Sequence, residues 1–193
     1  MNPDALDAPT WPDLGRALLI AAGLAVLIFW LVGAYNRLTR LRGAIGTAWQ
    51  QIDELLARRS LLLSSLTEAV REPLADEAAT LAALSQAEQR QRATALAVRG
   101  RAAQAVTLTA WVVAEGELAS PLARLLALLE QRPELASSEA VAPTFRELAV
   151  LAPRLAYARQ LFSSAAGSYN EALEEIPTRW VARVFSMRPT PPL

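Results

Sequence analysis

Residues 17–34 read ALLIAAGLAVLIFWLVGA, and this apolar run without a charge decides the fold. As a helix rising 1.5 Å per residue it spans about 27 Å, close to the roughly 30 Å hydrocarbon thickness of a bilayer. Arg16 and Arg37 flank the run, and Trp30 lies near its end, where interfacial aromatic residues are common. A buried core helix rarely stays apolar on every face for so many turns, so we predict a transmembrane helix over residues 17–34.

The flanks of this run favour an uncleaved anchor with a defined orientation. Acidic residues precede it, whereas a signal peptide begins with a basic segment and has a shorter apolar core. A cleaved signal peptide is the alternative. Three arginines follow the run (Arg37, Arg40 and Arg42), against Arg16 alone before it. The positive-inside rule therefore predicts that residues 1–16 are a short N-terminus outside the cytoplasm and that the large C-terminal part is cytoplasmic.

The composition removes most catalytic chemistry. The chain has no His and no Cys, and all 19 of its basic residues are Arg. His is the usual general base near neutral pH and the commonest metal ligand, while Cys and Lys are common nucleophiles. We therefore expect no enzymatic activity, no cofactor and no metal site. A formal net charge of zero also argues against a nucleic-acid binder, which usually carries a basic surplus.

The apolar residues that follow the run repeat in a heptad pattern typical of packed helices. Steps of three and four connect them over residues 38–69, and the pattern is interrupted only at Arg59. This pattern predicts one helix that continues from the membrane to about residue 71. We expect a second helix over residues 73–114, ended by Gly116.

Two further helices are expected in the C-terminal half. A Ser-Pro pair at residues 120–121 is typical of a helix start and opens a short leucine-rich helix. A last long helix covers residues 143–177, with a kink at Pro153. No alternating strand pattern occurs, so the fold class is all-α. We predict a transmembrane helix that continues into an elongated antiparallel bundle of about four helices over residues 35–177, and a tail over residues 178–193 near the membrane.

The start of the bundle resembles the LemA family. The family pattern reads YN-x-L-x-x-LR…AW-x-QID…L-x-RR, and the chain matches it from Tyr35 to Arg59. Later stretches follow in the family's order, among them the leucine-rich segment at residues 122–135, the Tyr-Asn pair at residues 169–170, and Phe185. The resemblance implies a single-pass protein of the bacterial inner membrane, with a cytoplasmic helical bundle and no established catalytic activity.

Five residues of the predicted bundle are candidates for a polar network that fixes helix register or contacts a partner: Arg42, Trp49, Asp53, Arg59 and Arg159. Arg59 and Arg159 occupy seam positions where an apolar residue is expected, and a buried arginine needs a carboxylate partner. The alternative is that the drift of a straight helix moves both to a solvated flank. Trp49 and Asp53 share one helix face. We expect Trp49 in the core and Asp53 paired with Arg42 or with an arginine of another helix.

A second candidate surface lies at the membrane end of the predicted bundle. If the second helix and the last long helix both descend, their ends return to the bilayer. Those ends and the anchor carry aromatic and basic side chains suited to an interface: Trp30, Trp111, Trp180, Phe185, Arg179 and Arg183. The alternative is that Trp111 and Trp180 pack on each other beneath the bundle.

These observations lead to one functional hypothesis with two alternatives. The hypothesis is a membrane-anchored scaffold or adaptor, without catalysis, that binds other membrane proteins or self-associates. Its expected partners are the lipid bilayer, other membrane proteins or a second copy, and no nucleic acid. One alternative is a lipid-sensing or membrane-remodelling protein that uses the aromatic and basic membrane-end surface. The other is an enzyme that works through carboxylates.

Overall fold

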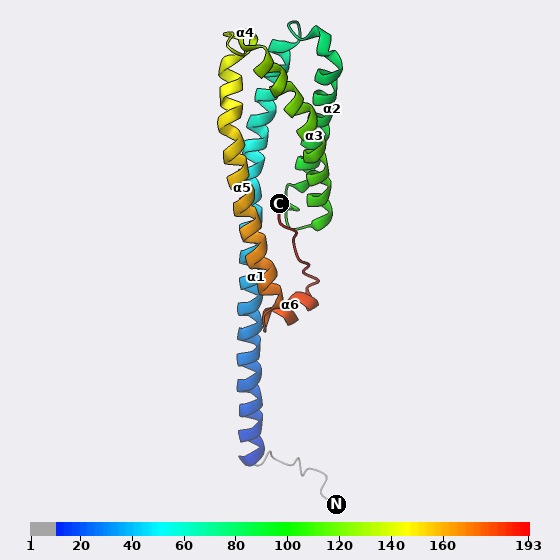
Figure 1. The fold of residues 1–193 in the computed structure, drawn as a ribbon. Coiled ribbons are helices and arrows are strands. Elements are labelled where there is room, and N and C mark those ends of the chain that lie inside the picture. Colours follow the sequence, from blue (N-terminus) through cyan, green and yellow to red (C-terminus); the bar gives the residue numbers. More distant parts are fainter. Residues whose placement is uncertain (1–10) are drawn as a thin grey trace, which may run out of the picture.

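The computed structural model describes residues 11–193, and every regular element in this range is a helix (Figure 1). The predicted all-α fold is confirmed. Of the predicted N-terminal segment, residues 1–10 lie outside the described residues. The elements are α1 (Trp11–Val70), the 3-10 helix η1 (Ala75–Glu77), α2 (Ala78–Val98), α3 (Ala105–Gln131), α4 (Pro133–Ala136), α5 (Ala142–Glu174) and α6 (Thr178–Val184).

Helix α1 is a single helix of 60 residues, as the heptad pattern predicts. Its N-terminal part extends beyond the rest of the molecule (Figure 1), with apolar side chains such as Leu19 and Phe29 more than three-quarters exposed. The first residue of α1 in the hydrophobic core is Ala34. In water such an apolar surface is unfavourable by about 25 cal/mol per Å². Among the described residues, α1 is the one helix long and apolar enough to span a membrane.

The bundle consists of two antiparallel helix pairs. Helix α5 runs back along α1, and α2 and α3 form a shorter hairpin beside them at the end far from the N-terminal apolar part of α1 (Figure 1). We call the end where α1 leaves the bundle the base. One buried cluster fills the half near the base, around Trp49, Trp111 and Phe162. A second cluster, around Leu66 and Leu125, fills the far half.

The predicted second helix over residues 73–114 is wrong, because the chain reverses at residues 99–104. Gly100 has a φ of 71°, in the left-handed region that interrupts a right-handed helix and favours glycine. Helix α3 then runs away from the base and continues through Gly116 and Pro121, where we expected helix ends. Proline removes one backbone donor, but Leu118 and Leu125 on either side of Pro121 are buried, and this burial stabilises the continuous helix.

The C-terminal segment packs against the base and then leaves it. Helix α5 ends at Glu174, and α6 lies against α1 and α5 (Figure 1). Beyond α6 the chain runs along α5 toward the turn between α2 and α3. There the side chain of Asn170 forms two hydrogen bonds with the backbone of Thr190. It accepts from the Thr190 N–H at 2.9 Å and donates to the Thr190 carbonyl at 2.8 Å. The tail over residues 178–193 therefore begins at the base and ends beside the α2–α3 hairpin.

Candidate functional site

Arg59 of α1 and Arg159 of α5 meet at Glu115 of α3. Both terminal nitrogens of Arg59 donate to the Glu115 carboxylate at 2.6 Å, and Arg159 Nη2 donates to Oε1 at 2.6 Å. The side chains of Arg59 and Glu115 are 11% and 16% exposed, and that of Arg159 is 31% exposed. The arginines therefore belong to an ion-pair triad, and the solvated-flank alternative does not hold for Arg59.

The charges in this triad do not cancel. Burial raises the pKa of Glu115, but the hydrogen bonds and charges of Arg59 and Arg159 outweigh burial and hold that pKa below its usual range. At neutral pH the triad is one carboxylate between two guanidinium groups, with a net charge of +1. The Arg159 guanidinium also lies 5.3 Å from the ring centroid of Trp111, within cation–π distance. Its Nε is buried without a hydrogen-bond partner in the described part of the chain.

An apolar groove lies between α3 and α5, and the triad closes one end of it. The groove has a volume of about 380 Å³. Apolar side chains of α3 and α5 line most of its length, including Leu122, Leu126 and Phe145, and Glu130 lies at the end far from the base. The sequence predicted neither this groove nor Glu115, because we expected the second helix to end at Gly116.

Trp49 lies in the core, as expected. Its ring packs edge to face on Trp111, with centroids 5.1 Å apart and planes at 88°, and Phe162 completes the cluster at 6.2 Å. Trp111 is 1% exposed. Its predicted place at the membrane interface is wrong, because α3 runs away from the base from residue 105 and buries Trp111 in the core. For the same reason Trp111 does not lie beneath the bundle with Trp180.

Asp53 pairs with an arginine of another segment, and Arg42 is not its partner. Arg99 Nε, at the end of α2, donates to Asp53 Oδ2 at 2.9 Å. A polar cavity of about 540 Å³ adjoins this ion pair and is lined in addition by Arg42, Trp49 and Arg101. The structure thus brings Arg42, Trp49 and Asp53 to one cavity, while Arg59 and Arg159 belong to the separate triad.

Helix α6 and the residue that follows it, Phe185, carry most of the remaining residues of the predicted interface. Phe185 contacts Tyr35 of α1, with ring centroids 4.9 Å apart, and Arg37 forms an ion pair with Glu175. These contacts place α6 where α1 leaves the bundle. The large apolar residues exposed here are Ile176, Trp180, Val184 and Phe185, while Arg179 and Arg183 are also exposed. We call these six residues the basal surface. Trp30, which is 44% exposed, lies further down α1.

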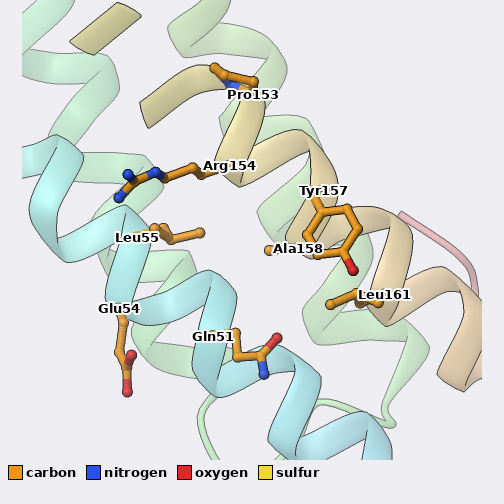
Figure 2. Close-up of a pocket in the computed structure, with 8 residues that line it drawn as sticks. All are labelled: Gln51, Glu54, Leu55, Pro153, Arg154, Tyr157, Ala158 and Leu161. Carbon is orange, nitrogen blue, oxygen red and sulfur yellow. The ribbon is translucent and has the colours of Figure 1, made fainter. Parts of the chain in front are cut away.

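The opposite side of α5 has a shallow pocket against α1, with a volume of about 490 Å³. Figure 2 shows Tyr157 and Leu161 of α5 beside each other, and Arg154 directed toward α1. Tyr157 is 62% exposed. Among the residues that the structure describes, no group of three or more His, Cys, Asp or Glu side chains is placed to hold a metal ion.

An anchor-like helix that continues without a break into an antiparallel helical bundle defines the general class of this protein. Within that class, the model of the LemA family matches residues 48–193, about three-quarters of the chain. The chain therefore belongs to the LemA family, as the motifs from Tyr35 onward indicated. No curated protein matches it.

Proposed function

We propose that this LemA-family protein is a membrane-anchored scaffold, without catalysis of its own, that docks a partner membrane protein in the groove between α3 and α5. The groove carries the proposal. It is an apolar concavity on the bundle with charged side chains at both ends, and exposed apolar grooves of this kind mark interaction sites. The continuous α1 supports it, since an unbroken helix fixes the groove relative to the bilayer.

The dimensions and charges of the groove favour an amphipathic helix as its occupant. Glu115 and Glu130 are 15 residues apart on α3, so the groove is about 22 Å long, or roughly four helical turns. Helix-in-groove recognition uses apolar residues spaced by three and four along such a length. The triad has a net charge of +1 and Glu130 is negative. A complementary helix carries a carboxylate at the base end and a basic residue at the far end.

Site-specific photo-crosslinking in native membranes tests this proposal. A photoreactive residue at Ala152, which is exposed and lines the groove, is expected to capture one membrane protein through an amphipathic helix. The same residue at Ala93, which is exposed on α2, is the control and is expected to capture none. Leu126→Asp places a charge in the groove and is expected to abolish the Ala152 product. A product that survives Leu126→Asp, or equal products at both positions, contradicts the proposal, and capture of a second copy identifies self-association instead.

The basal surface supports a second function, contact with lipid. Trp180, on a short helix with two arginines, and Phe185, directly after that helix, are each 58% exposed at the level where α1 leaves the bundle. Aromatic and basic side chains in this combination suit an interface with anionic lipid. In full-length protein with Trp180 as its sole tryptophan, brominated lipids are expected to quench the emission. Unquenched emission contradicts lipid contact at this surface.

We further propose that the anchor lies in a bacterial inner membrane with the bundle in the cytoplasm. Arg37, Arg40 and Arg42 support this orientation, since they follow the apolar part of α1 within about three turns. Both proposed functions require the bundle to be on one defined side of the membrane. A topology reporter fused to the C-terminus tests the orientation separately from either function.

A further inference from the structure

A cavity of about 360 Å³ lies beneath the N-terminal end of α3, outside both the groove and the basal surface. It is formed by four separate parts of the chain. Arg42 comes from α1, Tyr169 from α5, and Arg188 from the C-terminal tail, while residues 103–106 contribute the start of α3. No carboxylate side chain lines it. The cavity exists only because the tail passes along α5 below the α2–α3 turn.

The start of α3 supplies hydrogen-bond donors to this cavity. The first N–H groups of a helix have no acceptor within the helix, and the helix dipole adds partial positive charge there. Helix α3 has 27 residues, and the side chain of its N-cap residue, Gln104, makes no capping hydrogen bond. These backbone groups therefore remain available to an anion, which helix N-termini bind in many proteins.

Tyr169 supplies a second, independent donor. Its residue is 1% exposed and lines the cavity, yet its hydroxyl forms no hydrogen bond with any described residue, whereas the adjacent Asn170 binds Thr190. The hydroxyl itself is not closed off from solvent, so it can donate to a molecule in the cavity. Burial raises the pKa of Tyr169, opposed in part by the charge of Arg42, so the hydroxyl keeps its proton at neutral pH. This donor is therefore available to an acceptor that binds in the cavity.

The charge around the cavity is positive. Neither Arg42 nor Arg188 forms an ion pair within residues 15–193, where side chains are described. The neighbouring polar cavity shares Arg42 and Ala103 and adds Arg101. Guanidinium groups bind phosphate oxygens in pairs, with charge-assisted hydrogen bonds. From this arrangement we propose that the cavity binds a phosphate-class oxyanion between Arg42, Arg188, the Tyr169 hydroxyl and the first N–H groups of α3.

Two sources supply this chemistry, a free phosphate and a phosphorylated lipid headgroup. Arg42 lies seven residues beyond Tyr35, so the cavity is about 10 Å along α1 from the point where α1 leaves the bundle. The headgroup layer extends roughly 5–8 Å beyond the hydrocarbon. A free phosphate reaches the cavity from solution, and a headgroup reaches it only if its phosphate projects beyond this layer.

The proposal is tested by titrating inorganic phosphate into the full-length chain in a calorimeter at constant ionic strength. The detergent is dodecyl maltoside, which contains no phosphate. Saturable binding is expected. Tyr169→Phe removes only the hydroxyl and is expected to weaken binding about tenfold, the effect of one hydrogen bond to a charged group. Arg42→Gln is expected to weaken it at least as much. Arg92→Gln, which removes an exposed arginine of α2 outside the cavity, is the control and is expected to leave binding unchanged.

The outcomes separate a built site from general charge attraction. Equal losses in Arg42→Gln and Arg92→Gln, or unaltered binding in Tyr169→Phe, overturn the proposal. The thermal midpoint of Tyr169→Phe without phosphate is expected to equal that of the unaltered chain, because the ring and its packing remain. In nanodiscs, phosphatidylinositol 4-phosphate that competes with inorganic phosphate identifies a headgroup as the source, and failure to compete identifies a free phosphate. Crosslinking in the α3–α5 groove is independent of every one of these results.

Discussion

Replacing Glu115 by Gln is expected to destabilise the bundle more than any other single exchange of a charged residue. Glutamine keeps the shape of the side chain but leaves Arg59 and Arg159 facing each other without a countercharge. Removing one partner of a buried ion pair typically costs 3–5 kcal/mol. Because Arg159 is 31% exposed and water screens part of the repulsion, we expect about 3 kcal/mol at pH 7. Urea unfolding of the full-length chain in detergent, followed by tryptophan emission, measures this loss.

The pH dependence of stability gives an independent measure of the same interaction. The pKa of Glu115 is lowered in the folded protein from an ordinary value of 4.5. Its contribution is therefore present above that value and is lost as pH falls through the folded pKa. The free energy of unfolding is therefore expected to fall less on acidification below about pH 4.5 in Glu115→Gln than in the unaltered chain. The reasoning is refuted if Glu115→Gln costs less than about 1 kcal/mol, the range of exposed ion pairs, and stability falls on acidification as much as in the unaltered chain.

Further predictions concern the turn, the aromatic cluster and the orientation. Gly100→Ala is expected to lower the free energy of unfolding in urea by about 1 kcal/mol, because its φ lies in the left-handed region. Gly116→Ala is expected to stabilise α3 by roughly 0.5–1 kcal/mol, because the new Cβ has nothing within 4 Å. Trp111→Ala is expected to lower the free energy of unfolding by about 3–5 kcal/mol, because its ring is buried. In a variant that keeps Trp111 as its sole tryptophan, brominated lipids are expected not to quench the emission. A reporter that is active only outside the cytoplasm, fused at Leu193, is expected to stay silent, and activity there reverses the proposed orientation.

The sequence was sufficient to predict α1, since two patterns agree along it. An uncharged run and a heptad pattern meet without a breaker near Ala34, and the structure continues helically across that point. The end of α5 at Glu174 lies close to the end predicted at Pro177, although Pro121 and Pro153, which also lack a backbone donor, lie inside helices. Arg59 and Arg159 were recognisable as exceptions within apolar seams. Their partner was not recognisable, because a seam shows which face of a helix is buried and does not show which helices meet.

The course of α3 differs from the prediction because the periodic burial of its apolar face outweighs Gly116 and Pro121, at which the sequence predicts helix ends. Along α3 the buried face continues in steps of three and four through Gly116 and Pro121: Leu108, Trp111, Glu115, Leu118, Leu122, Leu125 and Leu129. This pattern was the available signal, and it places Glu115 in the seam as clearly as Arg59 is placed in that of α1. The turn at residues 99–104 was not predicted, because a single glycine such as Gly100 in an alanine-rich segment does not by itself reveal a left-handed φ.

The triad gives a physical reason why the two helix pairs keep one register. The α1–α5 and α2–α3 pairs have few backbone approaches to each other, so side chains determine how the hairpin sits on the longer pair. Apolar surfaces tolerate sliding, since burial is not directional. A bidentate contact is directional, and Arg59 and Arg159 converge on Glu115 in one register only. A shift of α3 by one turn, about 5.4 Å, breaks all three hydrogen bonds and buries unpaired charge. The same register fixes the start of α3 over Arg42 and Tyr169, and so the groove and the anion cavity depend on one set of charges.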